Sequence, residues 1–342
     1  MTVDDNHDGQ RLDNFLARLC RGVPRSHVYQ LIRSGQVRVN GGRASADRKL
    51  ATGDRVRIPP VRGGQTSQAA AQTDPGRLST GLANGSVLPV LFENEDLLVV
   101  DKPSGLAVHG GSGVSLGAIE ALRRQRPDAR FLELVHRLDR ETSGVLLIAK
   151  RRPALLHLQQ QFRDRRTDKT YLAVVCGRWP LRTKVIDHPL RRLAAPDGDR
   201  RVEVDASGRD ARTTVRGLLR LSMGEDGEFT LVLAKIDTGR THQIRVHLAA
   251  EGCPVLGDDK YGDFGLNRHM AKKGFKRMFL HAWTLEVGSL GGGRRMCFEA
   301  EPGGAFGALV AAAAGPSLNR EALAGLLGGR GRPAASAAAL SS

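Results

Sequence analysis

The chain has 342 residues, of which 40% are hydrophobic and 26% are charged, so it is long enough for two folded domains with cores of their own. Lysine and arginine number 52 and aspartate and glutamate 36, which gives a formal net charge of +16. This charge indicates a polyanionic partner such as nucleic acid. A basic protein that is merely kept soluble by its charge has the same composition, so the charge alone does not decide between the two.

Neither a disulfide scaffold nor a membrane protein fits the sequence. The four cysteines (Cys20, Cys176, Cys253 and Cys297) lie far apart and form no C-x-x-C pair, which argues against a zinc ribbon and a disulfide framework. The first residues, MTVDDNHDGQ, lack the basic start and apolar stretch of a signal peptide. No run approaches the roughly twenty apolar residues that span a bilayer. We therefore expect a cytoplasmic protein that does not associate with membranes.

Residues 11–60 predict a small unit of two helices followed by two strands. Apolar residues recur at helical spacing in RLDNFLARLC, and in SHVYQLIRSG we expect Ser26 to cap a second helix. The segments QVRVN and DRVRIPP alternate as strands on either side of a turn at Gly41 and Gly42.

This unit is also basic. Up to Pro60 there are eleven basic residues and six acidic ones. The segments RLDNFL, SHVYQLIRSGQVRVNG and KLATGDRVRI resemble the S4 RNA-binding domain. That resemblance implies that the two helices and the adjoining loop bind structured RNA, and it makes candidates of Arg11, Arg25, Arg33 and Arg38. A small basic domain that docks on another protein is the alternative.

Two segments lack the residues of a folded core. Residues 61–87 are rich in Gly, Gln, Ser, Thr and Ala and cannot bury enough surface to offset their chain entropy, so we predict a flexible linker. Residues 321–342 are biased toward Ala, Gly and Ser and predict a disordered tail. The second domain then covers residues 88–320.

The second domain alternates strands with a few helices. Strands are predicted at LPVLFE, at the buried run from Leu97 to Val100, and at KTYLAVVCG, ARTTVRGLLRL, EFTLVLAKIDTG and RMFLHAWTLEV. The segments GVSLGAIEALRRQRP and PALLHLQQQFRDRR predict two amphipathic helices. Two helices among many strands indicate an α+β domain on a mixed, largely antiparallel sheet.

Several common chemistries lack their motifs. GSGVSLG at residues 111–117 has its third glycine one residue too late for a dinucleotide loop, and no phosphate-binding P-loop is present. Ser143 lacks the G-x-S-x-G elbow of a hydrolase. His242 and His247 are five residues apart, which suits a metal pair neither on a strand nor on a helix. We expect no nucleotide cofactor and no metal.

Asp139 is the strongest candidate for chemistry. In LVHRLDRETSGVLLIAK it lies between Arg137 and Arg140, just before an apolar strand. An aspartate kept ionised by a guanidinium in a partly dry pocket can attack a carbon or take a proton. Arg240 and Arg245, in DTGRTHQIRVHLAAEG, are candidate partners because arginine binds a carboxylate bidentately. A structural Asp–Arg pair that joins two strands is the alternative.

Four segments carry a second resemblance. DKPSGLAVH, ELVHRLDRETSGVLLIAK, DKTYLAVV and TGRTHQIRVHLAAEGCPVLGDDKYG resemble, in order and separation, the pseudouridine synthases of the family that includes the ribosomal large-subunit enzymes. The resemblance runs from about Leu88 to Pro302 and is closest to members that isomerise several uridines in 23S ribosomal RNA. It implies base flipping and an isomerisation that needs neither cofactor nor metal.

The resemblance also implies roles for individual residues. Asp139 would attack C1′ of the flipped nucleotide or abstract a ribose proton to give a glycal, after which the detached uracil turns and C5 replaces N1 on the sugar. Tyr171 would stack on the base, and Arg245 would pair with Asp139. The other expected substrate contacts are Ile244 under the pocket, Arg137 where the uridine leaves its stack, His136 and Arg240.

The sequence thus predicts an rRNA pseudouridine synthase that acts on 23S RNA or on an assembly intermediate, and we expect a monomer because no exposed apolar heptad occurs. A non-catalytic S4-type rRNA-binding assembly factor is the alternative. A metal-dependent RNA-processing hydrolase would need clustered carboxylates or histidines. The segment FGLNRHMAKKGF after Tyr261 departs from the family pattern, as do the linker and the tail.

Overall fold

The computed structural model describes residues 1–4, 7–20, 23, 25–60, 87–110, 117–194 and 200–314. The predicted linker lies outside these ranges except for Val87, and so do the predicted tail and most of the glycine-rich segment 111–117. In the described part, no helix is long and apolar enough to cross a membrane.

The N-terminal unit has the predicted order of elements. Helices α1 (Leu12–Leu19) and α2 (Arg25–Arg33) are followed by the short antiparallel pair β1 (Arg38–Val39) and β2 (Val56–Arg57). Phe15, Val28 and Val56 belong to one buried cluster that joins the helices to the strands. One detail of the prediction is wrong: α2 begins at Arg25, so Ser26 lies in its first turn and does not cap it.

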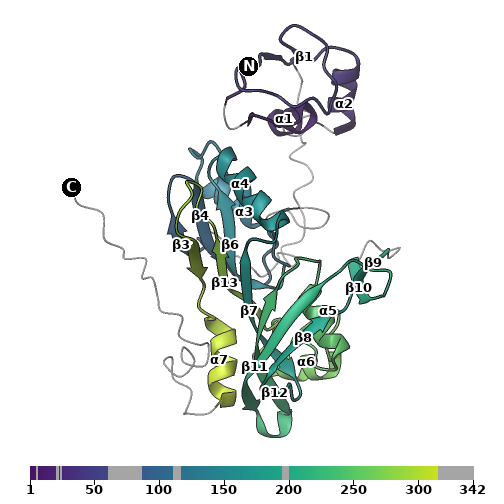
Figure 1. The fold of residues 1–342 in the computed structure, drawn as a ribbon, viewed down its shortest axis with the longest axis vertical. Coiled ribbons are helices and arrows are strands. Elements are labelled where there is room, and N and C mark those ends of the chain that lie inside the picture. Colours follow the sequence, from purple (N-terminus) through teal and green to yellow (C-terminus); the bar gives the residue numbers. More distant parts are fainter. Residues whose placement is uncertain are drawn as a thin grey trace, which may run out of the picture.

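The second domain is built on a ten-stranded sheet (Figure 1). The main path runs β3-β4-β6-β13-β7-β12-β11-β8, with β14 beside β13 and β5 beside β6. All pairs are antiparallel except β6 with β13, so the predicted α+β class with a mixed, largely antiparallel sheet is confirmed. The strands are β3 (Val90–Glu93), β4 (Leu97–Lys102), β5 (Glu133–Leu134), β6 (Ser143–Ala149), β7 (Asp168–Cys176), β8 (Thr183–Asp187), β11 (Arg212–Ser222), β12 (Glu228–Ile236), β13 (Leu280–Val287) and β14 (Met296–Glu299).

Helices surround this sheet, and a separate hairpin accompanies it. The predicted helices are α3 (Ala118–Gln125) and α4 (Arg152–Arg163), and the structure adds α5 (Gln243–Ala250), α6 (Phe264–Lys272) and α7 (Gly304–Ala314). The hairpin pairs β9 (Leu190–Ala194) with β10 (Arg200–Val204), and η4 (Gly224–Asp226) is a single 3₁₀ turn. The sequence predicted two helices in this domain, which is fewer than the structure contains. Helix α5 is buried on nearly every side and α7 is almost uniformly apolar, so neither shows an amphipathic stripe.

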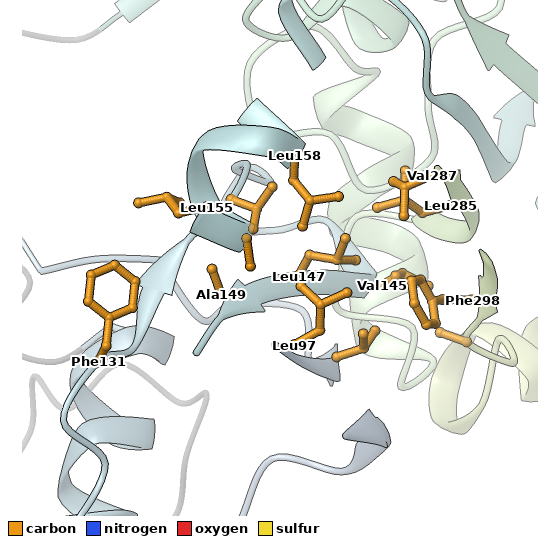
Figure 2. Close-up of a cluster of buried hydrophobic side chains, with 14 residues drawn as sticks. Leu97, Phe131, Val145, Leu147, Ala149, Leu155, Leu158, Leu285, Val287 and Phe298 are labelled. Atoms are coloured by element: carbon orange, nitrogen blue, oxygen red, sulfur yellow. The ribbon is translucent and has the colours of Figure 1, made fainter. Parts of the chain in front are cut away.

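Side chains that alternate along the strands form a different core on each face of the sheet. On one face, Leu155 and Leu158 of α4 pack on Val145 and Leu147 of β6, as Figure 2 shows. Helix α7 covers the continuation of this face over β7 and β12.

The opposite face carries the site. Helix α3 packs over β4 and β6, and Ile244 and Leu248 of α5 pack over β7 and β12. Tyr171 on β7 contacts both of these clusters. Its side chain therefore lies where the two halves of this face meet.

Candidate active site

Asp139 lies in the loop that leads into β6, and buried contacts hold this loop in place. The neighbouring Leu138 is buried in the cluster under α3. The Thr142 amide donates to the Asp139 carbonyl at 3.2 Å, and the Gly105 amide donates to the Arg140 carbonyl at 2.9 Å. The Asp139 side chain itself is 29% exposed, so a substrate can reach it.

Lys102 supports the same loop from below. Its ammonium is buried and donates to the carbonyls of Pro103, Leu106 and Arg140 at 2.8, 2.8 and 3.0 Å. Burial lowers the pKa of Lys102 to about 7, while the charges of Glu141 and Asp139 oppose this shift. Three carbonyls match the three donors of an ammonium, so the residue ties β4 to the loop of Asp139.

Gly144 allows β6 to approach β13 closely where the loop ends. Its φ is +110°, and a Cβ at this position would lie 2.1 Å from the carbonyl oxygen of Ala282. Only glycine fits such a backbone beside another strand. The close approach fixes the start of β6, and with it the position of the loop.

Arg245 reaches Asp139 from α5. Its Nη1 donates to Asp139 Oδ2 at 3.2 Å, while Nε and Nη2 donate to the two oxygens of Asp258 at 2.7 and 2.8 Å. The Arg245 side chain is 4% exposed, and its guanidinium also lies 5.2 Å from the ring centre of Tyr261. Burial disfavours its charge, but the hydrogen bonds and charges of Asp258 and Asp139 raise the pKa of Arg245 above its ordinary value.

Asp258 in turn is fully buried, and its side chain is saturated with donors. Besides Arg245, the amides of Lys260 and Tyr261 donate to its Oδ1 at 2.9 and 3.0 Å. Burial opposes ionisation, yet the pKa of Asp258 is lowered because Arg245 and these amides stabilise the carboxylate. The bidentate pair therefore fixes the guanidinium, which presents its remaining edge to Asp139.

Tyr171 completes the centre of the site. It lies on β7 beside Ile244, in the face that also carries Asp139. Burial, followed by the negative charge of Asp139, raises the pKa of Tyr171, so the phenol stays neutral. Among the described residues its hydroxyl has no hydrogen-bond partner. A reachable carboxylate, a buried guanidinium and a flat aromatic side chain thus converge on one place.

Known proteins match the sequence over both units. The family model of RNA pseudouridylate synthases matches residues 96–250, and that of the S4 domain matches residues 10–56. Proteins named ribosomal large subunit pseudouridine synthase C are similar to the chain. The one from Pasteurella multocida is 48% identical over 83% of this chain and 84% of its own length, and the one from Haemophilus influenzae is 45% identical over 88% and 90%.

The chain belongs to the RNA pseudouridine synthase family.

Solved structures of this family share its fold. Human RNA pseudouridylate synthase domain containing 1 is 28% identical, with a TM-score of 0.54 over 65% of this chain and 87% of its own. Human RNA pseudouridylate synthase domain containing 4 is 26% identical, with a TM-score of 0.53 over 65% and 91%. The predicted resemblances to the family and to the S4 domain are therefore confirmed, and the chain is an RNA pseudouridine synthase.

The structure brings together four of the predicted site residues of this synthase. Asp139, Arg245, Tyr171 and Ile244 share one face of the sheet. Arg137, two residues from Asp139, is exposed, and among the described residues its guanidinium has no partner.

Two other predicted substrate contacts have their side chains engaged elsewhere. The ring of His136 stacks on Phe162 of α4 at 5.0 Å and accepts a hydrogen bond from the Leu147 amide at 3.1 Å, on the opposite face of the sheet. Burial, and then the charge of Lys169, lowers the pKa of His136 to about 4. Arg240 donates from Nε to the carbonyl of Asp210 at 3.0 Å. The structure therefore packs His136 on the opposite face and joins Arg240 to Asp210, and it places neither against Asp139.

The predicted S4 contacts differ in availability. Arg33 is exposed on α2, whereas Arg11 forms an ion pair with Asp13 at 2.8 Å. Arg38 donates to the Gly41 carbonyl at 3.2 Å. The side chain of Arg25 lies outside what the structure describes.

Three residues of the site were not singled out from the sequence. Asp258 and Tyr261 lie in GDDKYG, and Lys102 lies in DKPSG. Lys102 could have been found because it ends the apolar strand β4, where its side chain is buried. A buried charge needs polar partners, so a lysine at such a position indicates a specific contact. Asp258 carried no such signal, because it becomes buried only when the turn after α5 packs back on Arg245 of that helix.

Proposed function

We propose that the protein isomerises uridines of the large-subunit 23S ribosomal RNA to pseudouridine. The observation that carries this proposal is Asp139, a reachable carboxylate held at one oxygen by the buried Arg245 and placed beside Tyr171. The relatives named as large-subunit synthases support the choice of ribosomal RNA. An rRNA substrate in turn implies work in the cytoplasm, and a single copy of the chain contains every residue used here.

The chemistry we assign to these residues is an exchange of two bonds to the ribose. The target uridine leaves its stack and its base lies against Tyr171. Asp139 attacks C1′ or removes a ribose proton, and the N1–C1′ bond breaks. The uracil turns, and the C5–C1′ bond forms as the Asp139–C1′ bond breaks or, on the other route, as the ribose regains its proton. C5 then loses its proton and N1 gains one. Arg245 holds Oδ2 of Asp139 in place through its hydrogen bond of 3.2 Å.

The N-terminal unit serves to anchor the RNA. Its helices carry the exposed Arg33, and basic residues exceed acidic ones eleven to six up to Pro60. Contacts to phosphate hold the RNA without reading its sequence, so this unit supplies affinity while the second domain supplies the reaction.

The experiment compares ribosomal RNA from cells with and without the gene. Total RNA is treated with a carbodiimide that marks pseudouridine, and modified positions are read as reverse-transcription stops. We expect stops in 23S RNA that disappear with the gene and return when the wild-type gene is restored.

Restoring Asp139→Asn instead tests the catalytic assignment. The amide has nearly the same shape as the carboxylate but is neither a nucleophile nor a base, so we expect no stops to return. Affinity for the RNA, measured by filter binding, should stay within about twofold of wild type because most of the binding energy comes from phosphate contacts. Equal activity of this variant would remove Asp139 from the mechanism. If all stops persist without the gene, the rRNA-binding assembly factor becomes the better interpretation.

A further inference from the structure

A histidine next to Asp139 has no role in the mechanism given so far, and the inference about it rests on the proposed function. We propose that His242 is a positioning residue: its neutral imidazole carries the proton on Nε2, directs this N–H toward Oδ2 of Asp139, and so leaves Oδ1 as the oxygen that acts on the ribose.

The ring of His242 lies between Asp139 and Tyr261. Its Nε2 is 3.9 Å from Asp139 Oδ2, and its Nδ1 is 2.8 Å from the Tyr261 hydroxyl. The residue precedes α5 with a φ of +54°, a left-handed conformation that is unfavourable for a side chain of this size. Such a conformation persists only where the surroundings impose it, and here it turns the ring toward Asp139.

The contacts of Tyr261 favour one position of the imidazole proton. The Val202 amide of β10 donates to the Tyr261 oxygen at 3.0 Å. The phenol therefore acts as an acceptor there, and its own hydrogen is left to donate to Nδ1 of His242. A ring nitrogen that accepts carries no hydrogen, so the neutral ring bears its proton on Nε2.

Burial and the neighbouring cations favour the neutral form of the ring. The titratable groups that face it are Asp139, Arg245, Asp258, Lys260 and Tyr261. Burial is the largest cause that lowers the pKa of His242; the cations Arg245 and Lys260 add to it, and the two carboxylates oppose it. An imidazolium would be a second positive charge beside Asp139, after Arg245, and would weaken the carboxylate as a nucleophile or base. A neutral N–H orients the carboxylate without adding this charge.

Arg245 and His242 both face the same oxygen of the carboxylate. Nη1 of Arg245 lies 3.2 Å from Oδ2, the atom that Nε2 of His242 also faces. Among the described residues, Oδ1 receives no hydrogen bond. The separation of 3.9 Å is too long for a hydrogen bond, but contacts of this kind shorten when substrate fills a site.

Four variants test the inference by tritium release from transcripts of 23S RNA labelled at uracil C5. We expect His242→Ala to lower kcat about 100-fold, as a misplaced group does, with an unchanged KM. His242→Gln, whose amide N–H can replace Nε2–H, should restore most of kcat. His157→Gln, on α4 at the opposite face, is the matched control and should equal wild type.

The third variant of the site is Tyr261→Phe, and its readouts are specific to the tautomer. Without the donor to Nδ1 the neutral ring loses stabilisation, so the pKa of His242 rises and the acidic limb of the kcat profile moves to higher pH. The ¹⁵N spectrum of histidine-labelled full-length protein, assigned with His242→Gln, should show the Nε2–H tautomer in wild type and a mixture of tautomers in Tyr261→Phe.

Two results would overturn the inference: a wild-type kcat in His242→Ala, or an Nδ1–H tautomer in the wild-type spectrum. Thermal melting of each variant confirms that it is folded, and His242→Gln keeps the test valid if His242→Ala does not fold. If the wild type itself releases no tritium from ribosomal RNA, the proposed function fails instead, and the ¹⁵N spectrum still decides the tautomer.

Discussion

At the scale of single residues, the Asp139 carboxylate is the last of three side chains joined by hydrogen bonds. The side chain of Asp258 is fully buried, that of Arg245 is 4% exposed and that of Asp139 is 29% exposed. Two hydrogen bonds of 2.7 and 2.8 Å join the first pair, and one longer bond of 3.2 Å joins the second. The rigid pair therefore decides where Arg245 lies, and Asp139 keeps one oxygen free.

The variant Asp258→Asn tests this order of control. It removes a buried charge that pairs with Arg245, so we expect the free energy of unfolding to fall by about 3 kcal/mol. It also frees the guanidinium to move, and kcat should fall by about 100-fold. Urea denaturation and tritium release measure the two effects.

Asp259→Asn is the matched control for that variant. Its carboxylate is 59% exposed and lies 3.4 Å from the same guanidinium. Exposed ion pairs contribute little, so this variant should resemble wild type in both assays. Equal effects of the two substitutions would show that charge near Arg245 matters rather than the buried bidentate geometry.

At the scale of elements, the site depends on the one parallel pair of the sheet. Gly144 and Ser143 of β6 lie beside Ala282 and His281 of β13. Side chains also join the two strands here: Ser143 Oγ lies 2.8 Å from His281 Nδ1 and 2.7 Å from Arg277 Nη2. These contacts hold the strand that carries the loop of Asp139 against the strand next to Tyr171.

The variant Gly144→Ala should break this junction. Its Cβ would lie 2.1 Å from the Ala282 oxygen at a φ of +110°, so β6 must move away from β13. We expect the free energy of unfolding to fall by about 3 kcal/mol, with a matching loss of activity in the folded fraction. Gly291→Ala, which meets nothing within 4 Å, is the control and should leave the melting temperature unchanged.

At the scale of the whole molecule, RNA affinity and reaction are assigned to different units. Deleting residues 1–70 removes the S4 unit and its excess of basic residues. Each lost phosphate contact reduces the steepness of log K against log salt by nearly one, so we expect weaker binding of 23S RNA with a flatter salt dependence. Filter binding between 50 and about 200 mM salt measures it. An unchanged slope would place the main phosphate contacts in the second domain.

Buried histidines also make global stability depend on pH. Burial lowers the pKa of both His136 and His281 to about 4, below the ordinary value of 6.5. Between these values the unfolded chain binds more protons at these two sites than the folded one does, so their contribution to stability falls as the pH drops from 6.5 toward 4 and is constant above that range. Each histidine contributes a slope of up to about 1.4 kcal/mol per pH unit. Urea denaturation from pH 7 to 5 measures the slope, and His281→Gln should reduce it.

The sequence predicted most elements because their apolar patterns are periodic. The strands β6, β7, β12 and β13 and the helices α3 and α4 lie where alternation or helical spacing placed them. Helix α5 shows no amphipathic pattern because residues 243–248 are all buried, so polar residues such as Gln243 and Arg245 do not mark an exposed side. Burial of this kind comes from tertiary contacts, which a single sequence does not display.

The same distinction applies to the site. Asp139 and Arg245 stand in specific motifs, and the structure brings them together. His136 stands in the same motif as Asp139 yet points to the opposite face, because side chains of an extended segment alternate between faces. Asp258 was missed because it lies 13 residues after Arg245, and only the turn that follows α5 brings the two side chains together.

The order of strands in the sheet has a consequence for synthesis of the protein. β13 lies between β6 and β7, although it is made more than one hundred residues later than either. Until it emerges from the translating ribosome, the half of the sheet that carries Asp139 and the half that carries Tyr171 have no strand between them. The nascent chain can therefore fold its halves early, but it gains an assembled active site only when its last long strand inserts in the middle.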